Sequence, residues 1–402
     1  PVEIQVNGKT TNVQNPLWVK TPTELKDEDY KAFYQTLFPY NPEPLFWIHL
    51  NVDYPFNLKG ILYFPKLMHE LDARKGQIQL FCQQVFVTDS AKEVVPEFLT
   101  VLQGAIDCPD LPLNVSRSFL QNDPYVQRIA KHIVKKVADK LTELFKSDRA
   151  AFEGHWEEIG PFVKYGMLQD SEFYDKAKDC ILFKTSHGQS ITISDYLEGN
   201  TAEEKEIYYS SHPDNQASYI KLCEDQGLKV LVFSSMIDSH FIQFLETKLE
   251  KTKFVSVESS VGEKLINKSD ENSESAETIK TLFQNTLGQD KLKIQIEALK
   301  DESIPALLTQ PEYVKRFKEM SHMMGQKRGG IPGLDDYTLV VNRANPLVKK
   351  LITLTEDESQ KETVNDIIHH LYEITLLGQK PFTGEEMLRF TKRATALLSK
   401  IG

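Results

Sequence analysis

A short polar loop carries the side chains with the clearest chemical potential in this sequence. Residues 110–121 read Asp-Leu-Pro-Leu-Asn-Val-Ser-Arg-Ser-Phe-Leu-Gln and run into a predicted helix that begins near Pro124. Within this loop, Arg117 follows the amide of Asn114 and the hydroxyl of Ser116, and Gln121 comes shortly after it. A guanidinium offers a planar fork of donors that matches phosphate oxygens. Arg117 is therefore a candidate phosphate-binding residue, and the alternative is a surface arginine paired with an acidic side chain.

The elements on either side must hold this loop in place. Residues 122–124 form a favourable helix start, with an N-cap residue followed by proline, and apolar residues then recur at helical spacing to Leu144. A loop fastened between two packed elements presents Arg117 with little freedom, as charge stabilisation requires. A helix is also predicted just before the loop, from apolar residues at helical spacing: Val94, Phe98, Val101 or Leu102, and Ala105.

Strands and helices are predicted along the rest of the chain. Apolar runs at 45–52 and 58–64, separated by Asp-Tyr-Pro-Phe, predict a hairpin, and residues 77–87 predict one further strand. Residues 151–179 have a helical pattern, and strands alternate with helices between 206 and 257. The segment 259–276 is polar, free of aromatic residues and typical of a linker. The chain closes with two predicted helices.

Composition limits the class of protein and its partners. The chain has 402 residues, of which 40% are hydrophobic and 26% charged, which predicts two to four globular domains. A net charge of -11 argues against a nucleic-acid partner, because phosphate backbones demand clustered Lys and Arg. The sequence has no apolar stretch long enough to span a bilayer, so no membrane partner is expected.

The cysteines and the common catalytic motifs point to no further chemistry. Four widely spaced cysteines form no CxxC pair, so neither a metal site nor a disulfide framework is expected, and a reducing cytoplasm fits best: Cys82, Cys108, Cys180 and Cys223. Cys108 lies beside acidic residues, which disfavour a thiolate nucleophile. His132 is interpreted as a helix-packing residue. The sequence contains no Gly-x-Ser-x-Gly, His-Glu-x-x-His or dinucleotide motif.

Several motifs occur together in one order: 85–89 (Val-Phe-Val-Thr-Asp), 95–99 (Val-Pro-Glu-Phe-Leu), 104–107 (Gly-Ala-Ile-Asp) and the loop itself. In this order and spacing they resemble the middle domain of the heat-shock protein 90 chaperone family, in its bacterial HtpG-like form. The resemblance extends from Trp18 to near the last residue. It implies that Arg117 contacts the γ-phosphate of ATP, bound with Mg²⁺ by a separate N-terminal domain, and that Asn114 and Gln121 support it as catalytic residues.

The resemblance also sets the expected organisation. It implies two αβα layered middle subdomains joined by helices and then a small α+β dimerisation domain, a multidomain α+β and α/β fold class. The predicted boundaries are 1–150, 151–258, a linker at 259–276, and 277–402. Because the sequence starts at Pro1 without an initiator Met, it is interpreted as a fragment. ATP hydrolysis is expected only in the full-length chaperone, and no cofactor is expected on this fragment.

The resemblance also implies a docking role for one residue, and three other positions depart from the family pattern. Phe86 is expected in an apolar patch that meets the ATP domain, with a buried strand residue as the alternative. Ser118 stands where the family usually has an acidic residue, Phe183 where arginine is common, and His240 where bacterial relatives usually carry a tryptophan.

The stretch 313–324 predicts an amphipathic helix whose apolar face could contact client proteins. Lys315, Lys318 and Glu319 lie mainly off that face. A deformable Met-rich surface suits varied apolar segments, and the alternatives are a core helix or a soft-metal site at His322. Trp18 is a second expected contact, or a partly buried anchor of its own core. The expected client-binding residues are Trp18, Tyr313, Phe317, Met320, Met323 and Met324.

The last two helices predict a homodimer. Each carries an apolar stripe that a helical hairpin cannot bury alone, and a four-helix bundle across a two-fold axis would cover both. The alternative is burial against the rest of the last domain. The expected interface residues are Ile367, Leu371, Ile374, Leu388, Leu398 and Ile401. The competing function for the whole chain is a dimeric scaffold without a nucleotide role, which the sequence upstream of Pro1 would distinguish.

Overall fold

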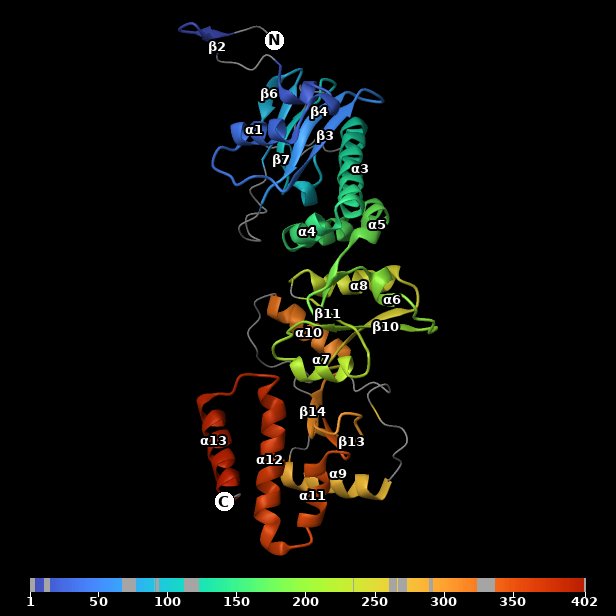
Figure 1. Ribbon diagram of the computed structural model, residues 1–402, viewed down its shortest axis with the longest axis vertical. Coiled ribbons are helices and arrows are strands. Elements are labelled where there is room, and N and C mark those ends of the chain that lie inside the picture. The colour runs from blue at the N-terminus through green and yellow to red at the C-terminus, as the bar shows by residue number, and fades with distance from the viewer. Residues whose placement is uncertain are drawn as a thin grey trace. The chain divides into compact units, whose positions relative to one another are not determined.

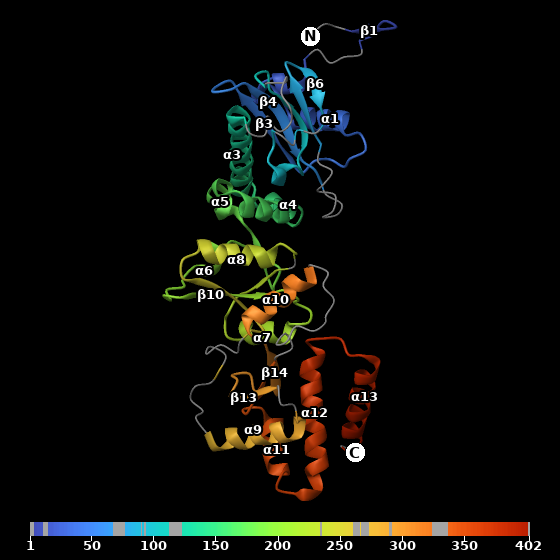
Figure 2. The ribbon, with the colours of Figure 1, turned by 180° about the vertical axis from the view of Figure 1, so that it is seen from behind.

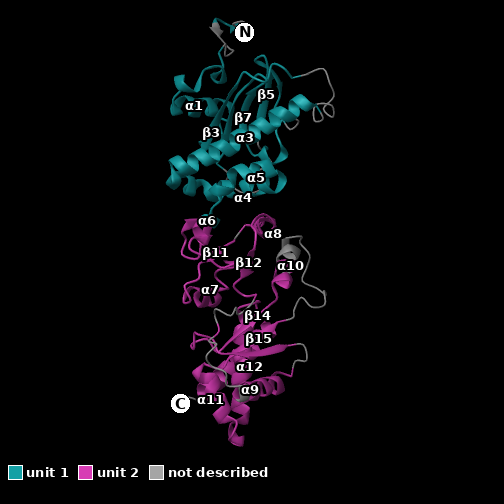
Figure 3. Ribbon diagram, turned by 90° about the vertical axis from the view of Figure 1, so that its right-hand side faces the viewer, with its two compact units in different colours: residues 1–182, 192–194 teal, residues 183–191, 195–402 magenta. Residues whose placement is uncertain are grey.

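The computed structural model describes two compact units of the chain (Figure 3). Unit 1 comprises residues 1–182 and 192–194, and unit 2 comprises residues 183–191 and 195–402. The structure describes residues 4–10, 15–66, 77–89, 91, 94–111, 123–233, 235–259, 266, 273–288, 292–323 and 337–400. Helices and several sheets alternate along these residues, which confirms a mixed α and β multidomain fold. Among them, no helix is both long enough and apolar enough to cross a membrane.

Unit 1 is built on a five-stranded sheet with the strand order β3-β4-β7-β5-β6 (Figures 1 and 2). The predicted hairpin is confirmed, because β3 and β4 pair antiparallel from Phe46↔Phe64 to Val52↔Leu58. The first core lies where Trp18, α1 and β4 meet, with Tyr34 and Tyr63 fully buried. The strands of this sheet are β3 (Phe46–Val52), β4 (Leu58–Phe64), β5 (Ile78–Cys82), β6 (Val85–Thr88) and β7 (Gln103–Asp107).

Helices pack around this sheet and continue toward the end of unit 1. The predicted long helix after the Arg117 loop is confirmed as α3, and the Asp123 side chain caps it by accepting a hydrogen bond from the backbone N–H of Tyr125. One face of α3 contacts β3, and α3 also packs on α4 and α5. The helices are α1 (Asp27–Leu37), α3 (Pro124–Ser147), α4 (Arg149–Gln169) and α5 (Ser171–Ala177), with 3₁₀ turns η1 (Leu17–Val19), η2 (Pro22–Glu24), η4 (Glu97–Leu99) and η5 (Lys178–Cys180); β1 (Gln5–Val6) pairs with β2 (Lys9–Thr10).

The helix predicted across residues 94–105 is wrong. Only the turn η4 forms there, and residues 103–107 form β7, a central strand in which every residue is buried. A short run of consecutive apolar residues fits a buried strand as well as a helix, so spacing alone could not separate them. Gly104 has a φ of 139°, and a Cβ at this position would collide with the carbonyl oxygen of Ile61 on β4. The close approach of β4 and β7 therefore requires glycine there.

The single strand predicted across residues 77–87 is also wrong, because the segment forms the hairpin β5-β6. Gln83 and Gln84 connect the two strands, with φ values of 53° and 65°. Two-residue hairpin turns with both residues at positive φ usually carry Asn or Gly. Two glutamines give no such signal in the sequence, so the turn could not be recognised.

Unit 2 begins with a small α/β layer whose strand order is β12-β10-β11-β8-β9. The strand β10 pairs in parallel with both β11 and β12, and Figure 1 shows α7 and α8 on opposite faces of this sheet. This alternation confirms the layer predicted from the sequence. Its elements are β8 (Phe183–Thr185), β9 (Ser190–Ile191), α6 (Ile193–Leu197), β10 (Lys205–Ser210), α7 (Ala217–Glu224), β11 (Val230–Val232), α8 (Asp238–Lys248) and β12 (Thr252–Ser256).

The rest of unit 2 is organised around a three-stranded sheet with the order β13-β15-β14. Its core is formed by α9, α11 and α12, with Phe283, Val348 and Ile368 almost fully buried. A second core joins this region to the small α/β layer, because Leu299 and Leu307 pack with Tyr208 and Leu222. The elements are α9 (Ser273–Leu287), β13 (Lys293–Glu297), β14 (Ala306–Thr309), α10 (Glu312–Met323), β15 (Thr338–Asn342), α11 (Pro346–Leu354), η7 (Glu358–Gln360), α12 (Lys361–Leu377) and α13 (Gly384–Ser399).

Candidate functional site

The ends of the predicted phosphate-binding loop are tied to each other in unit 1. The Asp110 carboxylate accepts hydrogen bonds from the backbone N–H of Asn57 (3.1 Å), from its side-chain amide (3.0 Å) and from the Tyr125 hydroxyl (2.9 Å). The hydrogen bond from the Asn57 backbone, helped by that from Tyr125, lowers the pKa of Asp110. Residues 112–122, including Asn114, Arg117, Ser118 and Gln121, lie outside the described residues.

The thiol that precedes this loop has no role as a nucleophile at neutral pH. Cys108 is fully buried, and burial raises the pKa of its thiol to about 12. A neutral, buried thiol packs like a small apolar side chain. The thiolate is disfavoured, as predicted from sequence, but the main cause is burial and not the neighbouring acidic residues.

An apolar patch lies on the edge strand of the same sheet. Val85, Phe86 and Val87 on β6 are 66%, 54% and 38% exposed. The Phe86 ring packs against Phe81 at 5.7 Å between centroids, so the exposed ring is held in place from behind. The structure therefore places Phe86 at the surface and not, as in the alternative, inside the sheet.

Trp18 belongs to the core that lies beside the neighbouring strand β5. Its ring packs against Phe81 at 4.9 Å, and its indole N–H points to the Asp107 carboxylate at 3.4 Å. The side chain is only 4% exposed. This position favours the anchoring role for Trp18 over contact with a client.

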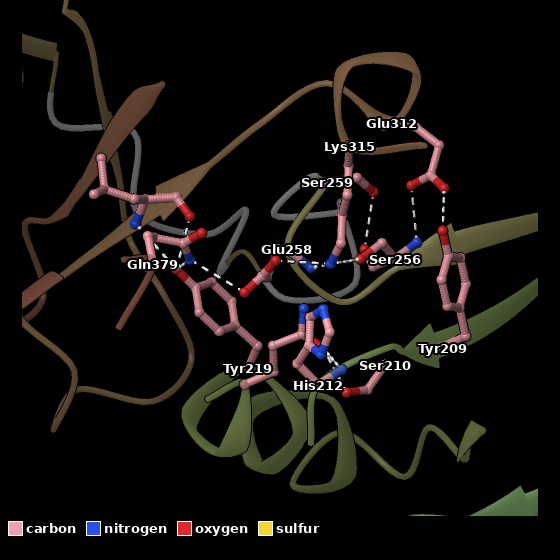
Figure 4. Close-up of polar contacts among 12 residues, drawn as sticks. Tyr209, Ser210, His212, Tyr219, Ser256, Glu258, Ser259, Glu312, Lys315 and Gln379 are labelled. Carbon is pink, nitrogen blue, oxygen red and sulfur yellow. Dashed lines mark hydrogen bonds and ion pairs between the residues drawn. The ribbon is translucent and has the colours of Figure 1, made fainter. Parts of the chain in front are cut away.

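In unit 2, the helix α10 turns Val314 and Lys315 inward. Lys315 is 6% exposed, and its ammonium contacts the Glu258 carboxylate at 2.7 Å and the Ser256 hydroxyl at 2.5 Å (Figure 4). On the outer side, Tyr313 is 75% exposed and Phe317 is 44% exposed. Lys315 therefore lies off the Tyr313/Phe317 face, as expected, and its charge has buried partners on β12 and just after it. The side chains of Met320 and Met323 are not described, and Met324 lies outside the described residues.

A second group of charges closes the edge of the small α/β sheet. The Arg316 guanidinium forms two bonds to Glu246, at 2.7 and 2.9 Å, and one to Glu312 at 2.9 Å. These three side chains also bond outward-facing backbone groups of β12, the edge strand: Arg316 to the Phe254 carbonyl, Glu246 to the Phe254 N–H, and Glu312 to the Ser256 N–H. Burial has the largest single effect and would raise the pKa of Glu246, but the bonds from Arg316 and from the Phe254 N–H, together with the nearby positive charges, lower it. Such capping protects a sheet edge from other strands.

A groove of about 840 Å³ runs beside this capped edge. Its walls come from the end of α8, from β12 and from the first turn of α10, including Leu249, Val255 and Tyr313. The exposed Tyr313 ring therefore belongs to both the groove and the outer face of α10. Sequence reasoning found Tyr313 and Phe317 but missed Glu246, Glu258 and Arg316. The spacing of Glu312 and Arg316 predicts a helical ion pair, but no sequence signal links α10 to carboxylates more than fifty residues earlier.

The last two helices differ in how far they bury their apolar stripes. Val364, Ile368 and Leu371 on α12 belong to the core of unit 2, whereas α13 has no buried residue. The apolar side chains left exposed at the end of α12 and on α13 are Ile374, Leu377, Met387, Leu388 and Leu398. Ile367 is half-buried against the core, and Ile401 lies outside the described residues.

The two other departures from the family pattern take different positions. Phe183 is 2% exposed and packs edge-on against Phe233 at 5.5 Å, so it belongs to the core of the small α/β layer. His240 lies exposed on α8. An arginine at position 183 could not occupy the same apolar site without a partner for its charge.

Comparison with known proteins identifies the class of protein as a chaperone. The family described as "Hsp90 protein" matches residues 2–401. Relatives named "Chaperone protein HtpG" from Porphyromonas gingivalis and Bacteroides fragilis are each 43% identical over 373 residues, covering 89% and 88% of this chain and 54% of the relative. A Myxococcus xanthus relative of the same name is 27% identical over 434 residues, covering 100% of this chain and 65% of the relative.

The chain belongs to the Hsp90 family. It spans about half the length of the first two relatives.

Proposed function

We propose that this chain binds unfolded or partly folded client proteins through the outer face of α10. The observation that carries the proposal is the orientation of the helix: Lys315 is buried in an ion pair with Glu258, Arg316 pairs with Glu246, and the aromatic side chains Tyr313 and Phe317 face outward. Exposed aromatic residues on a firmly held helix bind apolar segments at low entropic cost. Membership of a chaperone family supports this assignment. Met320, Met323 and Met324 extend the proposed face, and the cytoplasm is the proposed compartment.

The second part of the proposal concerns ATP, with Mg²⁺, in a longer protein that includes an ATP-binding domain. Arg117 would contact the γ-phosphate, and Asn114 and Gln121 would support it. The hydrogen bond between Asp110 and Tyr125 supports this role, because it fixes the ends of the loop. Phe86, exposed on β6, would dock against the ATP-binding domain. A dimeric scaffold without a nucleotide role is the competing function.

The third part is a homodimer through α13 and the end of α12. An amphipathic helix with no buried residue leaves its apolar side chains in water unless a partner covers them. Ile374, Leu388 and Leu398 would form this interface, flanked by Ile367 and Ile401. Leu371 is 5% exposed inside unit 2 and would support α12 from within.

Replacing Tyr313 and Phe317 together by Ser is expected to weaken suppression of client aggregation by about tenfold, because a few aromatic residues supply most of the energy of an interface. Both side chains are exposed, so the thermal midpoint should change little. The measurement is light scattering of a heat-denatured client at increasing chaperone concentration.

The matched control for this variant replaces Tyr40 and Tyr54 by Ser. These two tyrosines are 98% and 88% exposed in unit 1 and carry no proposed client contact. Equal loss of activity in both double variants, or a large loss of stability in the Tyr313/Phe317 variant, would contradict a client face on α10.

Replacing Leu388 and Leu398 by Asp is expected to raise the dimer dissociation constant by about 100-fold or more, because each substitution brings an unpaired charge into an apolar interface. Sedimentation velocity over a range of concentrations measures it. The control is Leu347→Asp, because the Leu347 side chain on α11 is 37% exposed and lies outside the proposed interface. This variant should leave the dimer intact. A wild-type chain that stays monomeric at micromolar concentration would refute the dimer.

A further inference from the structure

One buried carboxylate in unit 2 is bonded by two different parts of the chain. Glu258, two residues past β12, accepts the Lys315 ammonium at 2.7 Å on one oxygen and the side-chain amide of Gln379 at 3.1 Å on the other. Gln379 follows α12 directly, in the connection to α13. Figure 4 shows Glu258 between these two side chains. The carboxylate therefore joins the inner face of α10 to the end of α12.

Gln379 is itself held in place from the other side. Its amide also donates to the Tyr219 hydroxyl at 3.2 Å, and Tyr219 in turn donates to the carbonyl oxygen of Leu308 at 2.7 Å. Burial, followed by the nearby Glu258 charge, raises the pKa of Tyr219, so the phenol stays protonated and able to donate. The chain of bonds runs from α10 through Glu258 and Gln379 to α7 and β14.

The ion pair between Lys315 and Glu258 is the costlier of the two contacts to break. Glu258 is 8% exposed and Lys315 is 6% exposed, so water has little access to their bond, whereas Gln379 is half-buried. A buried pair of this kind contributes little to stability beyond what apolar residues would give, but it fixes the relative position of the elements that carry it. The position of α10 therefore depends on the position of the segment after α12, and the position of that segment depends on that of α10.

We propose that Glu258 is a positioning residue that couples the client face of α10 to the dimer surface at the end of α12 and on α13. This inference rests on the proposed function, since it assigns Tyr313 and Phe317 to client contact and α13 to the dimer. Binding of a client at α10, or of the second protomer at α13, changes the geometry of the Glu258 bonds. Each binding event then changes the affinity of the other surface for its own partner by the same factor, as linkage requires. Coupling of this kind amounts to about 5-fold to 150-fold in typical cases.

The first test needs neither client nor dimer. In the full chain, Gln379→Ala is expected to raise hydrogen exchange of the backbone amides at 312–317 by about fivefold or more, because it removes one of the two side chains that hold Glu258 in place against Lys315. Amides of β15 in the core of the same unit should change by less than twofold. Gln295→Ala, which removes an exposed amide bonded to Glu297, is the control and should alter neither.

The outcomes of this test decide the inference. Unchanged exchange in α10 overturns it, and so does a parallel rise throughout unit 2, which is the result of general destabilisation. Faster exchange confined to α10 supports the link through Glu258 even if the chain proves to be a monomer. Loss of the proposed function and loss of the coupling are therefore distinguishable.

The second test measures the coupling through the dimer dissociation constant. This constant is measured for Lys315→Met, for Gln379→Ala and for the double variant. The fold-change in the double variant is expected to differ by about fivefold or more from the product of the two single fold-changes. Should Lys315→Met fold poorly, Lys315→Met/Glu258→Gln replaces it, because it leaves no buried charge unpaired. If the fold-change in the double variant equals the product of the single fold-changes to within twofold, the coupling is overturned.

Discussion

Replacing Arg117 by Ala, in a longer protein that includes an ATP-binding domain, is expected to lower ATP turnover by about 10² or more while leaving nucleotide affinity nearly unchanged. A guanidinium at the γ-phosphate acts on charge that develops in the transition state, so its loss reduces the rate more than binding. Steady-state hydrolysis and nucleotide titration on the same preparation separate the two effects.

Two further substitutions sharpen this test. Arg117→Lys keeps the charge but loses the planar fork of donors, so it should restore only part of the rate. Arg128→Ala removes an equal charge from the exposed side of α3, shortly after the loop, and should leave turnover unchanged. If Arg117→Ala hydrolyses ATP at the wild-type rate, Arg117 has no part in the reaction and the scaffold becomes the better interpretation.

Sequence patterns were sufficient where the signal is local. The start of α3 follows from Asp123 and Pro124, and its apolar stripe follows from helical spacing. The hairpin of β3 and β4 follows from two apolar runs around a turn. Each of these features is decided by residues within a few positions of one another, so an isolated segment already contains the information.

Patterns failed where the decisive partner lies far away in the sequence. Nothing near residue 105 indicates that β7 pairs with β4 on one side and β5 on the other, and this pairing, not local spacing, makes the segment a strand. Helical spacing separated Lys315 from the apolar face of α10 but did not show that Lys315 is buried. The partner carboxylates, Glu258 and Glu246, belong to the small α/β layer, and only the fold brings them to Lys315 and Arg316.

Resemblance predicted what neither pattern nor spacing could. The roles proposed for Arg117 and Phe86 came from motifs in a family order, since a lone arginine in a loop and a lone phenylalanine in a strand are common. The structure adds that Phe86 is exposed and that the loop ends are tied by Asp110 and Tyr125. The buried position of Lys315 on α10 came from the structure alone.

Replacing Lys315 by Met is expected to lower the free energy of unfolding of unit 2 by about 3–5 kcal/mol, because the change leaves the Glu258 carboxylate buried without a counter-charge. The Met side chain keeps most of the apolar stem of lysine, so lost packing contributes little. All three tryptophans, Trp18, Trp47 and Trp156, lie in unit 1. Urea unfolding followed by far-ultraviolet circular dichroism should therefore show the loss, while tryptophan fluorescence should report an unchanged transition.

The double variant Lys315→Met/Glu258→Gln separates the buried charge from every other effect of the substitution. It removes both charges and keeps an amide that can still bond Gln379, so it should recover most of the lost stability. A single variant as stable as the wild type, or a double variant no better than the single, would show that the ion pair does not hold α10 in place.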